Sequence, residues 1–311
     1  MNKKVNNLTI FGIGFVLITS GCSLKIQKDQ DKFYDNVNKY TKEFVDDDYL
    51  VCAHRGFSSK EVENTSNSLE KANKEKYIDY IEMDVRMTQD KEFVLSHNEK
   101  LFNYDHYIRV SEIPEKILLD CEYVYNKYKF MTFGKDGKFK NKKNKLFNDK
   151  FKLISLEDGI KKAKDKNIIL DLKFEDNGDE YITNFIKVID NIDTTNITIQ
   201  SKDLDNLKKI KRLRPNLNYS AIIDKTIDFQ DIDEFDNITV RKNYINDPIV
   251  KQKIKEGKQV FVWTVNSPKS FYEVANYFED DYDKVVYITD YPNEISYLLN
   301  DYKKVLKKTM K

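Results

Sequence analysis

The sequence predicts an α/β protein of the TIM-barrel type, in which eight parallel strands alternate with helices. Eight apolar runs of strand length, rich in β-branched and aromatic residues, recur along the chain. Charged segments with apolar residues at helical spacing separate most of these runs. The 311 residues include only nine glycines, and no Gly-rich turn follows the first strand, which argues against an open doubly wound sheet.

The predicted elements follow one another in a regular order. The strands are residues 49–53, 80–85, 168–172, 197–200, 219–223, 238–240, 260–264 and 285–289. Between them, residues 68–76, 155–166 and 204–213 have the apolar spacing of amphipathic helices. Residues 98–153 contain no clear strand–helix unit, so we interpret them as an insertion after the second strand, on the mouth side of the barrel. Its lysine-rich run, residues 134–145, is either a solvated loop or a surface for anionic lipids and phosphate-rich polymers.

The first 21 residues have the pattern of a secretory signal, which we expect to be removed. Lys3 and Lys4 precede an apolar stretch that is short for a membrane span, and Ser20 and Gly21 lead directly to Cys22. This pattern resembles a bacterial lipoprotein signal, in which the cysteine after the cleavage site receives a lipid. Thr19 stands three residues before the cysteine, where such signals usually have leucine. The alternative to the lipoprotein interpretation is an ordinary signal peptide. The lipoprotein interpretation predicts an extracytoplasmic protein, anchored to the cell membrane by a lipid on Cys22.

Charge and cysteine content exclude several classes of protein. Lysine and arginine total 53, aspartate and glutamate 52, and the net charge of +1 argues against a nucleic-acid binder. Cys52 and Cys121 are too few for a disulfide framework and lack the spacing of a zinc site, and we expect Cys52 to be buried. We assign residues 22–47 to a polar tether and a first helix, and residues 48–311 to the barrel. No feature of the sequence indicates a protein partner.

Acidic residues on two predicted strands form a candidate cation site. Glu82 and Asp84 occupy alternate positions on the second strand, so both side chains face the same side. Two carboxylates this close repel each other unless a cation lies between them, although an exposed acidic strand end explains the pair equally well. Asp171, on the third strand, lies within an apolar run, where exposure is hard to explain. Three carboxylates make an all-oxygen site that suits Mg²⁺ or Ca²⁺.

Two of the three histidines occupy positions typical of catalytic residues. His54 closes the first strand, at the end of the barrel where active sites lie. His97 follows a short hairpin after the second strand, which can fold the side chain back over the barrel mouth. Imidazoles with a pKa near about 6.5 can both take and give protons at neutral pH. His106 lies in the insertion, and we interpret it as an ordinary surface histidine.

Several short motifs resemble, in order and spacing, those of the glycerophosphodiester phosphodiesterase family. They are AHRG (53–56), VENT (62–65), IEMDV (81–85), TQD (88–90), VLSH (94–97), DLK (171–173), QS (200–201), VWTVN (262–266) and ITDYP (288–292). Together these motifs are far more specific than any one of them alone. The resemblance implies a TIM-type barrel that hydrolyses glycerophosphodiesters to an alcohol and glycerol 3-phosphate.

The resemblance also implies roles for the matched side chains. It assigns acid–base catalysis to His54 and His97, phosphate binding to Arg55 and Lys173, a divalent cation to Glu82, Asp84 and Asp171, and substrate binding to Glu63, Asn64 and Trp263. For Trp263, the only tryptophan, stacking on a glycerol or choline-type head group and simple packing in the barrel are both open.

Three positions depart from the family pattern. Asp171 stands where the family usually has glutamate, one methylene longer, which leaves the metal preference open. Lys91 replaces a glycine in the hairpin that carries His97, and Val62 replaces a proline. Two other functions are weighed against the glycerophosphodiesterase: a lipid phosphodiesterase of the sphingomyelinase D type, and a non-catalytic solute-binding lipoprotein. The substrate would be a small glycerophosphodiester or a lipid head group, and the loops at the barrel mouth decide which.

Overall fold

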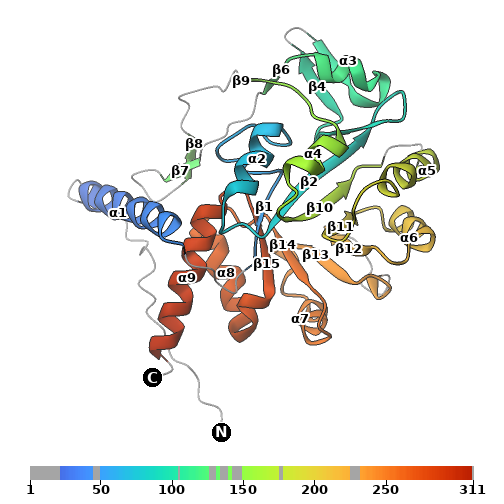
Figure 1. Ribbon diagram of the computed structural model, residues 1–311. Coiled ribbons are helices and arrows are strands. Elements are labelled where there is room, and N and C mark those ends of the chain that lie inside the picture. The colour runs from blue at the N-terminus through green and yellow to red at the C-terminus, as the bar shows by residue number, and fades with distance from the viewer. Residues whose placement is uncertain are drawn as a thin grey trace.

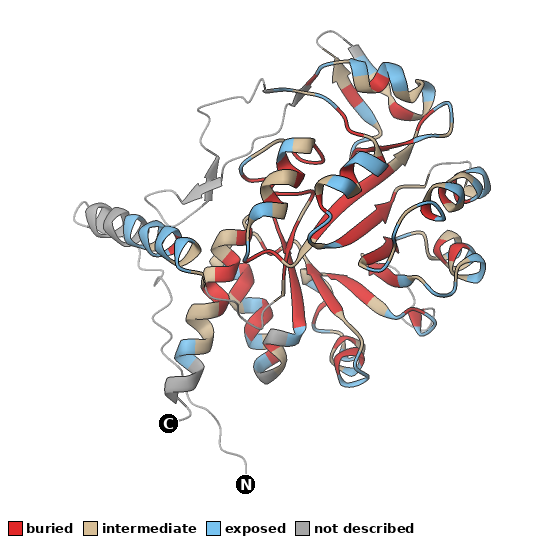
Figure 2. Ribbon diagram, in the orientation of Figure 1, coloured by how far each residue is buried: buried red, intermediate tan, exposed pale blue. Residues whose placement is uncertain are grey.

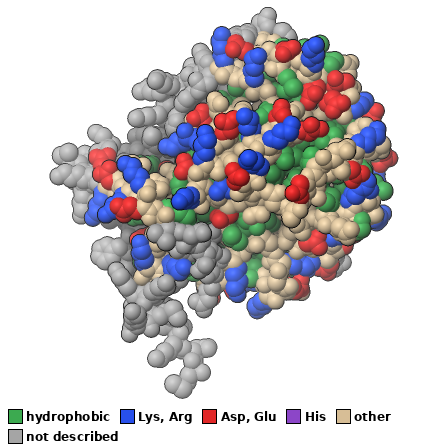
Figure 3. All heavy atoms as spheres, in the orientation of Figure 1, with side chains coloured by type: hydrophobic (Ala, Val, Ile, Leu, Met, Phe, Trp, Pro, Cys, Tyr) green, Lys and Arg blue, Asp and Glu red, His purple; other side chains and the backbone are tan. Residues whose placement is uncertain are grey.

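The computed structural model describes residues 22–44, 50–103, 106–125, 131–133, 139–141, 149–174, 178–224 and 232–309. The predicted signal segment and most of the lysine-rich run lie outside these ranges. No helix in the described part of the chain has both the length and the apolar character needed to cross a membrane. Acidic and basic side chains are interspersed over the face of the molecule shown in Figure 3.

Eight parallel strands close into a barrel, so the predicted fold class is confirmed (Figure 1). They are β1 (Leu50–Ala53), β2 (Tyr80–Met87), β10 (Asn167–Leu172), β11 (Ile197–Ser201), β12 (Asn218–Ile223), β13 (Asn237–Arg241), β14 (Val260–Trp263) and β15 (Val285–Thr289). Each strand pairs with the next in this order, and β1 pairs with both β2 and β15, which closes the ring. The predicted bounds differ from these by at most two residues at either end.

Helices cover the outside of the barrel and bury their apolar faces against it (Figure 2). They are α2 (Ser66–Lys74), α4 (Leu156–Lys162), α5 (Gly178–Ile189), α6 (Leu204–Leu213), α7 (Pro248–Lys255), α8 (Pro268–Phe278) and α9 (Pro292–Thr309), with the 3-10 turns Lys242–Tyr244 and Glu279–Lys284. Capping boxes built on Thr65 and Ser267 start α2 and α8. Before the barrel, α1 (Cys22–Lys42) packs on α9, where Tyr40 is hydrogen-bonded to Ser296 at 3.0 Å.

The insertion after β2 has secondary structure and a small core of its own. The short strand β3 (Phe93–Leu95) first pairs antiparallel with the end of β2. Then follow β4 (Lys100–Asn103), β5 (His106–Arg109), the 3-10 turn Val110–Glu112, α3 (Glu115–Asp120), β6 (Tyr123–Tyr125), β7 (Met131–Phe133), β8 (Phe139–Asn141) and β9 (Asp149–Phe151). Buried residues shared by these elements form the separate cluster Val94, Leu101, Val110, Leu118, Tyr123 and Leu153.

The barrel interior changes character along its axis. Cys52, Ile169, Phe261 and Val286 form an apolar cluster inside the ring, and Cys52 is fully buried with a free thiol, as expected. Further toward the C-terminal strand ends, most inward-facing positions are polar, beginning with Glu82, two residues after the inward-facing Tyr80, while Ile288 and Trp263 are apolar. The apolar cluster therefore closes the lumen below a polar chamber, and the candidate catalytic residues surround that chamber.

Candidate active site

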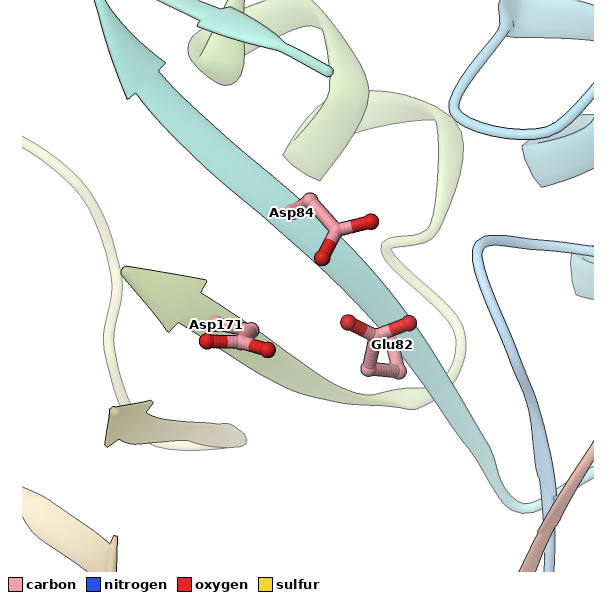
Figure 4. Close-up of side chains that lie close together, drawn as sticks. All are labelled: Glu82, Asp84 and Asp171. Carbon is pink, nitrogen blue, oxygen red and sulfur yellow. The ribbon is translucent and has the colours of Figure 1, made fainter. Parts of the chain in front are cut away.

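Three carboxylates converge inside the polar end of the barrel (Figure 4). Glu82 and Asp84 lie on β2, and Asp171 lies directly opposite Asp84 in the register of β2 and β10. Each residue offers an oxygen that lies within 4.8 Å of the others. Their exposed fractions are 2%, 1% and 8%, so an exposed acidic strand end is the wrong explanation of this pair. The strand alternation predicted from the sequence accounts for the shared orientation of Glu82 and Asp84.

Two basic side chains lie against these acids. The Lys173 ammonium is 2.9 Å from Oδ1 of Asp84 and also contacts Asp171. On the other side, Nε of Arg55 is 3.0 Å from Oδ2 of Asp84. Burial alone would raise the pKa of Asp84, but Lys173 and Arg55 outweigh it and hold this pKa well below its usual value. Asp84 is therefore a fixed negative charge in this site.

Glu82 has a different electrostatic environment. Its carboxylate accepts the backbone N–H of Arg55 at 2.9 Å. Burial, followed by repulsion from Asp84 and Asp171, raises the pKa of Glu82 well above its usual value. Burial also raises the pKa of Asp171, against the opposing charge of Lys173. A divalent cation between these oxygens would offset both burial and repulsion, and hard carboxylate ligands suit Mg²⁺ or Ca²⁺. The residues present thus fit a divalent metal site.

His54 is oriented by a carboxylate that lies within a quoted motif but to which the sequence analysis gave no role. Asp290, the residue after β15, accepts a hydrogen bond of 2.6 Å from Nδ1 of His54. Ser58 and Asn266 in turn donate to Asp290 at 3.0 and 2.8 Å. With Nδ1 engaged, the other ring nitrogen, Nε2, points into the site, 4.0 Å from Oε2 of Glu82. A polar residue directly after the last predicted strand was the signal that could have identified Asp290.

His97 reaches the same cavity from the hairpin that follows β2. The backbone N–H of Ser96 donates to the carbonyl of Asp84 at 3.0 Å, which holds this segment over the strand end. Nδ1 of His97 is 3.0 Å from Oδ1 of Asn98. Burial lowers the pKa of His97, although Asp84 opposes the shift, so the neutral ring is favoured. His106 begins β5, and its side chain lies outside the described part of the structure.

The turn after β1 places Arg55 and supports it. Arg55 and Gly56 both have positive φ, of 58° and 78°, and a Cβ at Gly56 would lie 2.8 Å from the backbone oxygen of Ser68. Glu63 accepts a hydrogen bond from Arg55 at 2.8 Å, and Asn64 donates to Asp84 at 2.8 Å. Neither Glu63 nor Asn64 lines the cavity. Both side chains support residues that do line it, and the substrate contact that the resemblance implies for them stays a prediction.

The cavity at the barrel mouth has a volume of about 460 Å³. Its lining includes His54, His97, Arg55, Lys173, the three acids, Arg86, Phe174, Gln200, Lys202, Asp224, Thr239 and Trp263. Trp263 is half-buried and also packs on the inner apolar cluster, so the two interpretations of this residue are compatible. Sequence reasoning placed eight of these side chains in one site. It gave no role to Arg86, Lys202 or Asp224.

Comparisons with known proteins give one consistent result. The sequence matches the Glycerophosphoryl diester phosphodiesterase family over residues 54–294. A phosphodiesterase of Oleispira antarctica, solved in complex with the product sn-glycerol-3-phosphate, is 19% identical with a TM-score of 0.64, over 81% of this chain and 96% of that one. A glycerophosphodiester phosphodiesterase of Parabacteroides distasonis is 20% identical, also with a TM-score of 0.64, over 82% and 98%. The comparison with curated proteins finds no match.

Proposed function

The chain belongs to the glycerophosphoryl diester phosphodiesterase family and is a glycerophosphodiester phosphodiesterase. We propose that it forms glycerol 3-phosphate and an alcohol, and that His54 and His97 act as the acid and the base. One observation carries the proposal: both imidazoles line one cavity together with three buried carboxylates and two basic side chains. Membership of an enzyme family sets aside the non-catalytic solute-binding alternative.

Glu82, Asp84 and Asp171 are the residues that would hold the divalent cation. When bound, the cation would offset negative charge on the phosphodiester as the reaction proceeds. Asp84 is already anionic through its contacts with Lys173 and Arg55. The raised pKa of Glu82, in contrast, favours the protonated form of its carboxyl group. Binding of the cation, which favours the charged form of Glu82, should therefore release a proton at pH values below the raised pKa of this residue.

The hydrogen bonds of the two histidines favour different roles. If Nδ1 of His97 donates to Asn98, its Nε2 carries a free lone pair, and the lowered pKa keeps the ring neutral. These properties suit a general base. His54 donates Nδ1–H to Asp290, which orients the ring with Nε2 toward the site, and this orientation suits the general acid that protonates the leaving oxygen.

Arg55 and Lys173 supply positive charge beside the site where the phosphodiester would bind. The pKa of each lies above its usual value because neighbouring acids outweigh the effect of burial, so both stay charged across the physiological range. Side chains fixed in this way can stabilise charge on the non-bridging phosphate oxygens without reorganising. Trp263 of β14 also lines the cavity, which supports the proposal that it stacks on the glycerol or head group.

The test is product formation from defined substrates. Purified protein should release glycerol 3-phosphate from glycerophosphocholine or glycerophosphoglycerol, followed by phosphorus NMR with and without a chelator. Sphingomyelin and lysophosphatidylcholine serve as the lipid arm, because a sphingomyelinase D-like enzyme would prefer them. Turnover of the lipids alone would replace the glycerophosphodiester assignment, and no turnover of any diester would refute it.

We also propose that residues 1–21 are a lipoprotein signal and that a lipid on Cys22 anchors the enzyme outside the cytoplasm. The support is the sequence pattern: two lysines, a short apolar stretch, and Ser20 and Gly21 leading directly to Cys22. Cys22→Ala should abolish lipid labelling and release the protein from the membrane fraction. Wild-type protein that is found entirely in the soluble fraction, with no lipid at its N-terminus, would contradict the proposal.

A further inference from the structure

His97 differs from the other site residues because it does not lie on a barrel strand. His54, Glu82 and Asp171 belong to the ring or directly follow it, whereas His97 lies two residues beyond β3. Its position relative to the three acids therefore depends on contacts that tie the segment after β3 to the barrel. One of these is the backbone hydrogen bond from Ser96 to Asp84, at 3.0 Å. A second comes from a side chain.

That side chain is Arg86, near the end of β2. Glu82, Asp84 and Arg86 occupy alternate positions on the strand, so all three face the cavity, and Arg86 is among its lining residues. Both Nε and Nη2 of Arg86 donate to the backbone carbonyl of His97, at 3.2 and 2.8 Å. Two donors of one planar guanidinium on a single oxygen fix that carbonyl more firmly than one donor could.

We propose that Arg86 is the positioning residue for His97, holding its backbone so that the imidazole stays at working distance from the bound phosphodiester. The strand that carries Glu82 and Asp84 also carries Arg86, so one rigid element sets both the acids and the second histidine. A misplacement of a catalytic group by about 1 Å can lower a rate by about 10²-fold. The proposal rests on the acid–base role proposed for His97.

A competing role for Arg86 is direct binding of the phosphate as a third cation, and the two roles have different kinetic signatures. A positioning residue acts through His97, so its removal should lower kcat and leave KM nearly unchanged. A phosphate ligand acts on the substrate itself, so its removal should raise KM whether or not His97 is present. A double-mutant cycle between positions 86 and 97 separates the two.

The experiment measures kcat and KM for wild type, Arg86→Ala, Arg86→Lys, His97→Ala and the double variant. We expect Arg86→Ala to lower kcat by about 10- to 100-fold with KM within about threefold. In the His97→Ala background the same change should have less than about a threefold effect. Arg86→Lys should retain part of the kcat that Arg86→Ala loses. Free guanidinium should raise the kcat of Arg86→Ala in a saturable manner.

Arg214→Ala is the matched control, because Arg214 also presents a guanidinium fork, to Asp190, but outside the cavity lining. It should retain wild-type kcat and show no response to guanidinium. The positioning role would be overturned if Arg86→Ala lowered kcat in the His97→Ala background as much as in the wild type. It would also be overturned if Arg86→Ala raised KM and left kcat unchanged. If Arg86→Ala is too unstable to assay, the cycle is closed with Arg86→Lys. A nearly wild-type His97→Ala would instead refute the acid–base function itself.

Discussion

Asp290 accepts a hydrogen bond of 2.6 Å from His54 across 236 positions of the sequence. The contact follows from closure of the barrel, because β1 pairs with β15 and places Ala53 opposite Thr289. His54 and Asp290 are the next residues along each strand, so they leave the ring side by side. An open sheet, in which the first and last strands lie at opposite edges, could not form this pair.

Asp290→Asn should lower kcat by about 10²-fold or more while the protein stays folded. An amide at this position can present N–H to Nδ1 of His54, which favours the tautomer with the proton on Nε2 and removes the acceptor that orients the ring. Steady-state kinetics with a thermal melt as folding control checks this. Asp193→Asn, at an exposed position, is the matched removal of a charge and should leave kcat unchanged. A kcat for Asp290→Asn equal to that of the control would show that Asp290 has no part in orienting His54.

Glu82→Gln should stabilise the metal-free protein near neutral pH. The pKa of Glu82 in the folded protein is raised, so the charged form is disfavoured there, and stability is lost as pH rises through that raised pKa. The neutral amide of the variant would remove this penalty, and its oxygen can still accept the N–H of Arg55. A gain of about 1 kcal/mol in a domain of this size raises Tm by about 2–4 °C.

Addition of Mg²⁺ or Ca²⁺ should make the wild type more stable than Glu82→Gln, because only the wild type retains all three carboxylates. Thermal melts of both proteins in chelator, and then in excess metal, give the comparison. The same chelator should abolish turnover by the wild type, and either cation should restore it. Full activity in protein shown to be metal-free would refute metal dependence.

His97→Ala should lower kcat by about 10²-fold or more and remove the acidic limb of the pH profile. In the wild type that limb should lie below pH about 6.5, because a base with a lowered pKa stays neutral to lower pH, and activity is lost only when it is finally protonated. A bound cation nearby would shift the pKa in the same direction. kcat/KM from pH 5 to 9 provides the measurement, with His106→Ala as the variant expected to match wild type. Equal losses for both variants would show that the site is misassigned.

The sequence predicted the barrel well because its buried strands are apolar runs with clear ends. It predicted that Glu82 and Asp84 face one side, since strand alternation is local. It could not predict that Asp171 lies opposite Asp84, because the register between β2 and β10 depends on the stagger of the whole ring. The strands of the insertion, only three or four residues each, are too short to show periodicity.

Supporting residues were the other gap. Arg86 acts on a backbone carbonyl, which any residue at position 97 would present, so no pairing of residue types marks the contact. Glu63 and Asn64 were assigned to the substrate by resemblance alone, and their contacts with Arg55 and Asp84 emerge only from the folded turn after β1.

Lys91 provides a test of backbone strain in the hairpin that carries His97. It has a φ of 71° at the position where the family usually has glycine, and it pairs with Glu180 at 2.9 Å. A side chain at positive φ costs about 1 kcal/mol, so Lys91→Gly should be more stable than Lys91→Ala by about that amount. Lys187, exposed within α5, is the control, where the alanine variant should be the more stable. Urea unfolding of the four variants measures both differences, and the same order at both positions would show that Lys91 is not strained.

The last prediction concerns the group that attacks phosphorus, either water or the 2-hydroxyl of the substrate's own glycerol. A neutral His97 can take the proton in either route, and His54 can protonate the leaving oxygen in either, so the two histidines do not decide. The 2-hydroxyl is already tethered next to phosphorus, and such groups reach effective concentrations on the order of 10⁵ M. We therefore expect a cyclic glycerol phosphate, as intermediate or product, and a much slower reaction for a 2-deoxy analogue of glycerophosphocholine. Phosphorus NMR resolves the cyclic species from glycerol 3-phosphate, and the 2-deoxy analogue supplies the matched substrate control. Equal rates for the two substrates, with no cyclic signal at early times, would establish direct attack by water.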